Sequence, residues 1–270
     1  MTFVALVTGA SSGIGAATAR RLAREPDVRL VLVARRRERL EALAEELGGA
    51  TVIALDLTGP EAPAQVRDAV QAEHGELHML VNNAGASWRG RFGDAGWANV
   101  ERNMTLDFEA PVRLTEALLP LLRGTAARAA SGTPRVCIVN VASTASRVAR
   151  PGAGAYSAAK FALAGWSDSL HAEEREHGIH VGLVLPGFVG TEGFPARELL
   201  ARPTTRWLVS RPEPVAEAIL EAGPGGRAER YVPRFYWIVA ALRIVAPRLM
   251  RRALRNGGLT TATSARSDET

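Results

Sequence analysis

Lysine and cysteine are almost absent from this 270-residue sequence. Lys160 is the only lysine among 33 lysine and arginine residues, and Cys137 is the only cysteine. A single cysteine excludes an internal disulfide, which suits a reducing compartment, and we expect a cytoplasmic protein. Arginine cannot replace lysine where chemistry requires a compact point charge on a flexible stem. The one retained lysine therefore suggests a position with a chemical function.

The sequence also lacks linkers, internal repeats and a basic surface outside one segment. No Gly/Ser-rich or Pro-rich stretch divides the chain, and hydrophobic residues make up 47% of it, enough for one large domain. Residues 227–255 hold eight arginines and one glutamate, so they account for the net charge of +5. Because the rest of the chain is near neutral, we expect no nucleic-acid partner.

Short apolar runs alternate with helical patterns along the chain. The apolar runs occur at 3–7, 29–33, 51–55, 78–81, 136–141 and 180–185, and the helical patterns at 14–24, 37–47, 61–74, 95–122 and 155–176. We expect a last strand at 230–232. Continuous apolar strands between amphipathic helices are typical of a parallel sheet covered on both faces. We predict one doubly wound α/β domain over residues 1–232, with ligands at the carboxyl ends of the strands.

The single lysine lies four residues after a tyrosine within a predicted helix. Residues at this spacing share one face of a helix, so Lys160 can place its ammonium beside the phenol of Tyr156. A nearby cation favours the phenolate form of tyrosine. The pair is thus a candidate for proton exchange with a substrate.

A glycine-rich turn follows the first predicted strand. It reads Thr8-Gly9-Ala10-Ser11-Ser12-Gly13-Ile14-Gly15. Glycines allow a tight turn there, and the following helix N-terminus attracts a pyrophosphate. Residues 9–13 also match the G-x-S-x-G motif of serine hydrolases, but no histidine stands out as a triad member. The turn therefore favours a dinucleotide site.

Arginines follow the second predicted strand. An aspartate or glutamate there would bind the free ribose 2′-hydroxyl of NAD, whereas this chain has Ala34-Arg35-Arg36-Arg37. A guanidinium suits a 2′-phosphate instead. We predict that NADP(H) binds in preference to NAD(H), chiefly through Arg35.

Taken together, these motifs resemble those of the short-chain dehydrogenase/reductase family, in its branch with a T-G-x-x-x-G-x-G glycine motif. The resemblance covers residues 3–232. Its further motifs are Asp56-Leu57, Asn82-Asn83-Ala84-Gly85, Asn103, Ser143, Tyr156-Ser157-Ala158-Ala159-Lys160 and Pro186-Gly187-Phe188-Val189-Gly190-Thr191, in the family's order and spacing. The resemblance implies a Rossmann fold, hydride transfer between a nicotinamide and a carbonyl or alcohol, and a homodimer or homotetramer.

The resemblance also implies roles for individual residues. Tyr156 would act as general acid or base, and Lys160 would stabilise its phenolate and hold the nicotinamide ribose. Ser143 would bind the substrate oxygen, and Asn103 would hold a water that connects Lys160 to solvent. No metal is implied. The implied cofactor-binding residues are Gly9, Ser11, Ser12, Gly13, Ile14, Gly15, Arg35, Arg36, Asp56, Leu57, Asn83, Ala84, Gly85, Tyr156, Lys160, Pro186, Gly187, Val189 and Thr191.

The resemblance does not extend to the segment beyond residue 232. Residues 233–255 form an apolar stretch followed by Pro247 and four arginines, and the stretch is too short to cross a bilayer. Three interpretations of this helical extension stay open: a helix packed on the body or on a second subunit, a lid over the substrate, and a basic segment on an anionic membrane surface. We expect residues 256–270, which are small and polar, to be a disordered tail.

Substrate contacts are less well defined by the sequence. We expect the loop 191–211 to close over the substrate. Candidate pocket residues, which follow strand ends or lie in that loop, are Ser87, Trp88, Ala145, Phe188, Phe194 and Trp207. They favour an apolar pocket and a lipophilic carbonyl or alcohol.

Two functions of other classes remain open. One is a dinucleotide-binding sensor or scaffold without turnover, which the intact set of Ser143, Tyr156 and Lys160 argues against. The other is a nucleic-acid binder that uses the arginine-rich segment, which lacks interleaved aromatic residues on a basic face.

Overall fold

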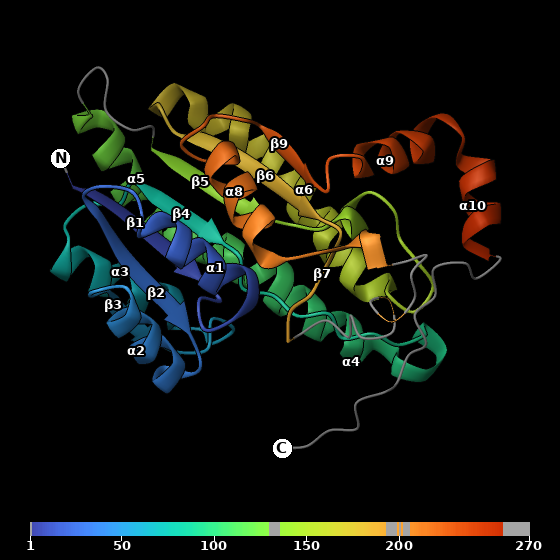
Figure 1. The fold of residues 1–270 in the computed structure, drawn as a ribbon, viewed down its shortest axis with the longest axis horizontal. Helices are drawn as coiled ribbons and strands as arrows, with labels where there is room; N and C mark the ends of the chain where they lie inside the picture. The colour runs from blue at the N-terminus through green and yellow to red at the C-terminus, as the bar shows by residue number, and fades with distance from the viewer. Residues whose placement is uncertain (1, 130–135, 193–198, 200, 202–205, 256–270) are drawn as a thin grey trace.

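Seven parallel strands form the central sheet of the computed structural model, which describes residues 2–129, 136–192, 199, 201 and 206–255 (Figure 1). The strand order is β3-β2-β1-β4-β5-β6-β9. The strands are β1 (Phe3–Thr8), β2 (Val28–Ala34), β3 (Thr51–Ala54), β4 (Met79–Asn82), β5 (Cys137–Val141), β6 (His180–Pro186) and β9 (Glu229–Val232). The order reverses between β1 and β4, where doubly wound sheets bind their ligands. The predicted fold class is confirmed.

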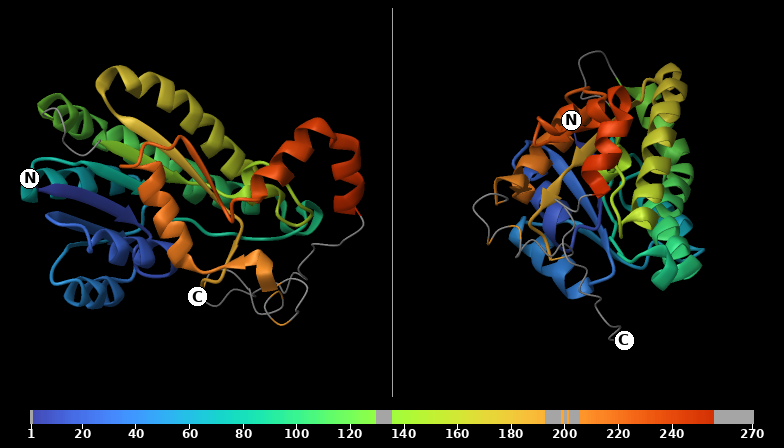
Figure 2. Two further views of the ribbon diagram at one scale, coloured as in Figure 1. Left: turned by 45° about the horizontal axis from the view of Figure 1, so that its top comes forward. Right: turned by 90° about the vertical axis from the view of Figure 1, so that its right-hand side faces the viewer.

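The central strands β1, β4, β5 and β6 are mostly apolar and buried because helices cover both faces of the sheet. In β1, Phe3, Ala5 and Val7 belong to one core and Val4 and Leu6 to the other, as the two-residue period of a strand requires. The first core is covered by α1 (Gly13–Leu22), α2 (Arg37–Glu46) and α8 (Pro212–Ala222), and the second by α3 (Ala62–Glu73), α5 (Ala110–Arg128) and α6 (Gly154–Glu174). The end-on view in Figure 2 shows these two layers on either side of the sheet.

The long helix predicted at 95–122 is interrupted. It consists of α4 (Phe92–Met104), a π-helical turn (Thr105–Glu109) and α5. A π turn holds one more residue than an α turn and changes which side chains face inward beyond it. This change places Asp107 in the interior, where it is fully buried.

Helix α8 is an element that the sequence analysis missed. It begins with Pro212-Glu213-Pro214, and proline is well tolerated in the first turn of a helix because those N–H groups lack partners there. This proline pair was the available signal. Short strands β7 (Phe188–Val189) and β8 (Val209–Ser210) pair beside α8 and hold the two ends of the predicted substrate loop together.

The C-terminal extension is helical, as expected. It forms α9 (Tyr236–Val245) and α10 (Pro247–Arg255), which project from the body beyond the end of β9 (Figures 1 and 2). Pro247 starts the second helix. The expected disordered tail, 256–270, lies outside the described residues. In the part of the chain that the structure describes, none of the helices has the length and apolar character needed to cross a bilayer.

Candidate active site

The carboxyl ends of the first four strands surround a cleft of about 680 Å³. Thirteen of the predicted cofactor residues line it: Gly9, Ser11, Ser12, Gly13, Ile14, Arg35, Arg36, Asp56, Leu57, Asn83, Ala84, Gly85 and Thr191. A smaller cavity of about 210 Å³ adjoins this cleft and is lined by Ser143, Tyr156, Lys160, Pro186, Gly187 and Val189. The two spaces share Ile14, Asn83, Gly85, Ala86 and Thr191. A ligand in the cleft can therefore reach the predicted catalytic residues.

The glycine turn is built for close backbone approach. Gly9 and Gly13 have φ of 67° and 54°, a region that favours glycine. A Cβ at Gly9 would lie 2.9 Å from the Cα of Ala84, and one at Gly13 would lie 2.9 Å from Thr191. Gly15 lines neither space, and a Cβ there would collide with the carbonyl oxygen of Gly9. The absence of side chains thus leaves a cradle that fits the pyrophosphate of a dinucleotide.

The first and fourth strand ends are fastened to each other beside this cradle. The hydroxyl of Thr8 accepts hydrogen bonds from the backbone N–H groups of Asn83 and Ala84, both at 2.9 Å. The side-chain amide of Asn83 donates to the carbonyl oxygen of Thr8 at 2.8 Å. The cradle therefore has a rigid wall.

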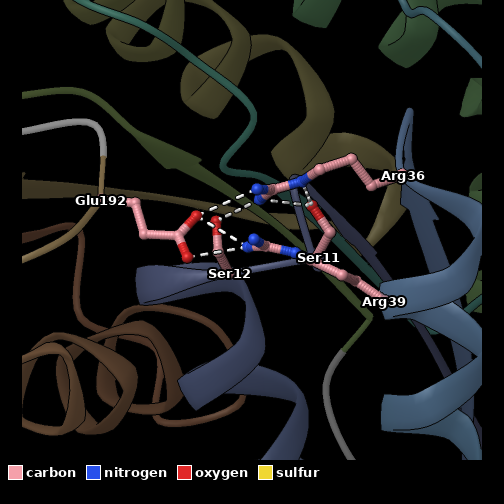
Figure 3. A network of polar contacts seen from close by, with 5 residues as sticks. All are labelled: Ser11, Ser12, Arg36, Arg39 and Glu192. Carbon is pink, nitrogen blue, oxygen red and sulfur yellow. Dashed lines mark hydrogen bonds and ion pairs between the residues drawn. The ribbon is translucent and has the colours of Figure 1, made fainter.

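A cluster of arginines and one glutamate lies at the rim of the cleft (Figure 3). The guanidinium of Arg36 donates to the hydroxyls of Ser11, at 3.0 Å, and Ser12, at 2.7 Å. Arg36 and Arg39 both pair with the carboxylate of Glu192, at 2.9 Å and 2.7 Å, and these pairings lower the pKa of Glu192. The carboxylate of Glu192 is thus an anionic group that these arginines already bind at the rim of the cleft.

Arg35 has a different environment from Arg36. Its side chain is 74% exposed, and a guanidinium nitrogen lies 3.8 Å from the carboxylate of Asp56. It lines the cleft but does not contact Ser11 or Ser12. Among the described residues, Arg36 is the arginine that binds those two serines directly.

In the smaller cavity, Tyr156, Lys160 and Ser143 lie together. Burial raises the pKa of the Tyr156 phenol, against the opposing effects of the Lys160 charge, the Ser143 hydrogen bond and the Arg89 charge. The Lys160 ammonium lies 5.9 Å from the centroid of the Tyr156 ring and donates to the carbonyl oxygen of Val141 at 3.1 Å. The two side chains share one face of α6, as their spacing predicts.

Lys160 has a buried counterion that the sequence analysis did not identify. Its ammonium lies 3.2 Å from a carboxylate oxygen of Asp107, which the π turn directs inward. Burial outweighs the attraction of Lys160 and raises the pKa of Asp107 to about 6. A Cβ at Gly85 would lie 2.5 Å from Asp107 and 3.4 Å from Lys160, so this glycine gives the ion pair its room.

The structure does not bring Asn103 into contact with Lys160. Its amide donates to the carbonyl oxygens of Asn99, at 2.8 Å, and Trp88, at 3.2 Å. Asn103 lies in the last turn of α4, before the π turn changes the orientation of the helix. Asp107 lies beside Lys160, and the link between Lys160 and solvent through a water held by Asn103 stays a prediction.

The family model for short chain dehydrogenases matches residues 3–198. The chain belongs to the short-chain dehydrogenase family. A short-chain dehydrogenase from Streptomyces avermitilis is similar in structure, with a TM-score of 0.75 and 30% identity, and the match covers 97% of this chain and 100% of that one. Pseudomonas aeruginosa RhlG in an NADP active-site complex is also similar, with a TM-score of 0.74 and 28% identity over 85% of this chain and 93% of that one.

Curated members of the family are similar over most of this chain. A fatty acyl-CoA reductase of Mycobacterium tuberculosis is 33% identical over 260 residues, which are 90% of this chain and 80% of the relative. Dehydrogenase/reductase SDR family member 7B of Danio rerio is 32% identical over 200 residues, 70% of this chain. The chain spans only 61% of that relative's length and 58% of its Bos taurus counterpart's.

The predicted substrate residues of this short-chain dehydrogenase do not all meet in one place. Ser87 and Phe188 line the smaller cavity, whereas Trp88 lines the larger cleft. The guanidinium of Arg102 lies 4.1 Å from the ring centroid of Trp88. Trp207 is largely exposed and packs against Phe235. Phe194 lies outside the described residues.

An apolar recess adjoins the smaller cavity on the side of the C-terminal extension. Ala145 lies in its wall, and Phe188 and Arg150 line both spaces. Val148 and Tyr231 add to the wall from the body. Most of the remaining apolar wall comes from the extension: Tyr236, Val239 and Ala240 of α9, and Met250 and Leu254 of α10. No group of three or more His, Cys, Asp or Glu side chains suited to a metal occurs within the described ranges.

Proposed function

We propose that this short-chain dehydrogenase transfers a hydride between NADP(H) and the carbonyl or secondary alcohol of a lipophilic substrate. The observation that carries the proposal is the position of Ser143, Tyr156 and Lys160 in a cavity that opens into the dinucleotide cleft. The nicotinamide, when bound, supplies or accepts the hydride. The glycine turn would hold the pyrophosphate, and residues 186–191 would lie beside the nicotinamide.

The catalytic side chains handle the proton and the substrate oxygen. In reduction, negative charge develops on the carbonyl oxygen, and the phenol of Tyr156 donates its proton there. Lys160 stabilises the phenolate that remains, and the hydroxyl of Ser143 orients the substrate oxygen. In oxidation the same phenolate accepts the proton. The carboxylate of Asp107 lies 3.2 Å from the ammonium of Lys160 and is its counterion in this buried place.

An assay of NADPH oxidation tests this function. Purified protein is supplied with aldehydes and ketones of increasing chain length, and we expect kcat/KM to rise with chain length. Tight NADPH binding without turnover of any carbonyl would favour the alternative, a dinucleotide sensor on the same fold.

The recess beside α9 and α10 supports a lipophilic substrate. Its walls are mostly apolar, and it continues from the catalytic cavity at Phe188. This arrangement favours the interpretation of the extension as part of the substrate site. The fatty acyl-CoA reductase among the relatives is named for a fatty acyl substrate, which agrees with such a site.

A variant that fills the recess tests that interpretation. We expect Ala240→Phe to lower kcat/KM for long-chain carbonyls about tenfold or more and to affect short ones much less, because the added ring occupies the space of the chain. Ile244→Phe is the matched control, since Ile244 lies on the same helix and is 78% exposed. Equal losses for long and short substrates would contradict this use of the recess.

The preference for NADP(H) is the second part of the proposal. Arg36, held by Ser11 and Ser12, and Arg35, across the rim, would bind the 2′-phosphate. NADP is also the cofactor named in the complex of the similar Pseudomonas aeruginosa RhlG. In this arrangement the carboxylate of Glu192 competes with the phosphate for Arg36.

Substitutions that should change NADPH affinity in opposite directions test the cofactor preference. Arg36→Ala should weaken NADPH binding about tenfold or more, Arg35→Ala should weaken it less, and neither should change NADH binding to the same extent. Glu192→Gln should strengthen NADPH binding because it frees the guanidinium. Fluorescence titration with both cofactors measures each effect. Equal losses of NADPH and NADH affinity would show that these arginines do not bind the 2′-phosphate.

We also propose a homodimer or homotetramer and a contact of the extension with anionic membrane surfaces. Ile244, Val245 and Leu249 are exposed on α9 and α10, beside Arg248, Arg251 and Arg252. Apolar side chains bordered by arginines suit a lipid interface. A cytoplasmic location stays a prediction.

A further inference from the structure

Tyr236, the first residue of α9, packs against the backbone that follows β6. Its ring occupies the space beside Gly187, because a Cβ at Gly187 would lie 2.8 Å from Cζ of that ring and closer still to Cε2. Burial raises the pKa of the Tyr236 phenol to about 12, so the side chain is uncharged near neutral pH. Gly187 lines the smaller cavity, so the C-terminal extension directly touches a residue of the cavity wall.

The phenol of Tyr236 contacts the body at a second point. Its hydroxyl donates to the carbonyl oxygen of Leu208 at 3.4 Å. Leu208 directly precedes β8, as Gly187 directly precedes β7. These two strands pair with each other, and the N–H of Gly187 donates to the carbonyl oxygen of Val232, at the end of β9, at 2.8 Å. One side chain of the extension thus contacts the backbone at the start of both short strands.

A stack of aromatic rings adds to these contacts. The ring centroid of Phe235 lies 4.7 Å from that of Tyr236, with 25° between the planes, and the ring centroid of Trp207 lies 5.3 Å from that of Phe235. Aromatic rings in offset or tilted arrangements at these distances attract each other. Because Trp207 directly precedes Leu208, the stack joins the start of β8 to the start of α9.

The strand pair that Tyr236 contacts contributes one wall of the smaller cavity. Phe188 and Val189 of β7 line this cavity together with Gly187 and Tyr156. Tyr236 is not among the described lining residues. An effect of Tyr236 on the reaction must therefore pass through the wall that β7 forms.

We propose that Tyr236 is a positioning residue for hydride transfer, which fixes β7 beside the nicotinamide and makes the C-terminal extension part of the active site. This inference rests on the proposed function, because that function places residues 186–191 beside the nicotinamide. Hydride transfer requires close and aligned carbon atoms, and a displacement of about 1 Å costs about a hundredfold in rate. The ring beside Gly187 and the hydrogen bond to Leu208 hold the strand pair against such a displacement.

Single-turnover kinetics test this role. The substrate is a short-chain ketone, because it does not extend into the apolar recess that Tyr236 also lines. We expect Tyr236→Ala to lower the rate constant of hydride transfer about a hundredfold and to change NADPH affinity less than about threefold. Tyr236→Phe keeps the ring and should lose no more than about threefold in rate. Trp237→Ala is the matched control, since Trp237 is the next residue of α9 and is 56% exposed.

The rate constant separates positioning from a loss of folded protein. A folding defect lowers the fraction of the protein that reacts, and so the amplitude of the single turnover, but leaves the rate constant of the folded fraction unchanged. A Tyr236→Ala protein with a reduced amplitude and the wild-type rate constant would overturn the positioning role.

A double variant tests the contact between the ring and Gly187. Gly187→Ala inserts a methyl group where the ring lies and should slow hydride transfer about tenfold or more. In Gly187→Ala/Tyr236→Ala the ring is absent and the methyl group has room, so we expect this protein to be no slower than Tyr236→Ala. Losses that multiply would show that the two residues act independently, which would overturn the positioning of β7 through this contact.

Hydrogen exchange of backbone amides, measured by NMR, tests the same contact without turnover. The N–H groups of Gly187 and Gly190 donate to the carbonyl oxygens at the ends of β9 and β8. In the NADP⁺ complex we expect Tyr236→Ala to speed the exchange of both amides about tenfold or more, because β7 opens more often, and Trp237→Ala to leave it unchanged. Unchanged exchange in Tyr236→Ala would overturn the positioning role alone. Faster exchange in that variant, with a wild-type protein that reduces no carbonyl, would overturn the proposed hydride transfer but not the contact of Tyr236 with β7.

Discussion

Tyr156→Phe should reduce the rate of carbonyl reduction about a thousandfold or more, with little change in NADPH affinity. The substitution removes one oxygen atom and with it the phenolic proton that the proposed mechanism delivers to the substrate oxygen. Hydride transfer then leaves the alkoxide charge without a proton. Stopped-flow measurement of NADPH oxidation at saturating substrate gives the rate, and fluorescence titration gives the affinity.

The control for this variant is Ser169→Ala, which changes an exposed residue of the same helix. It should retain the wild-type rate. If the Tyr156→Phe protein keeps a tenth or more of the wild-type activity, the phenol is not the proton donor and another group performs that step.

Lys160→Met should abolish turnover and also destabilise the protein in a pH-dependent way. The substitution leaves the carboxylate of Asp107 fully buried without its counterion. Breaking a buried ion pair by removing one partner costs about 3–5 kcal/mol. The loss of activity follows from the loss of the charge that stabilises the Tyr156 phenolate.

The direction of the pH dependence follows from the pKa of Asp107. This pKa is raised from 3.8 to about 6 with Lys160 present, and removal of the lysine raises it further. A carboxyl whose pKa is raised in the folded state makes its full contribution to the free energy of unfolding at pH values below its unfolded pKa. That contribution is lost as the pH rises through the folded pKa. The stability deficit of Lys160→Met should therefore be small near pH 4 and large above pH 7.

Urea unfolding at several pH values measures this deficit. The double variant Lys160→Met/Asp107→Asn should regain most of the stability at high pH, because no buried carboxylate remains, but none of the activity. A deficit that does not vary with pH would show that Asp107 is not the group left uncompensated. Asp107→Asn alone should lower the pKa of Tyr156, since the carboxylate raises it, and should move the pH profile of alcohol oxidation to lower pH.

The parts of the site that the sequence predicted are those fixed by local geometry. Gly9 and Gly13 lie in a turn that needs positive φ, and Tyr156 and Lys160 meet because four residues make about one turn of helix. Apolar strands that alternate with helices also defined the sheet. Each of these features depends on residues close together in the chain.

The parts that the sequence did not reveal depend on irregular backbone or on distant contacts. Asp107 faces Lys160 only because a π turn interrupts a helix that a regular pattern would continue. Glu192 reaches Arg36 across 156 positions of sequence. Arg89 and Arg150 belong to no motif and meet at the cavity because two strand ends are adjacent in the sheet.

The most direct test of hydride transfer follows the hydrogen itself. The best carbonyl substrate is reduced with NADPH that carries deuterium at C4 of the nicotinamide, in each of the two stereochemical forms, and the alcohol product is analysed by mass spectrometry. The account predicts deuterium on the former carbonyl carbon from one form and none from the other. Product without deuterium from either form would contradict direct transfer between the cofactor cleft and the Tyr156 cavity.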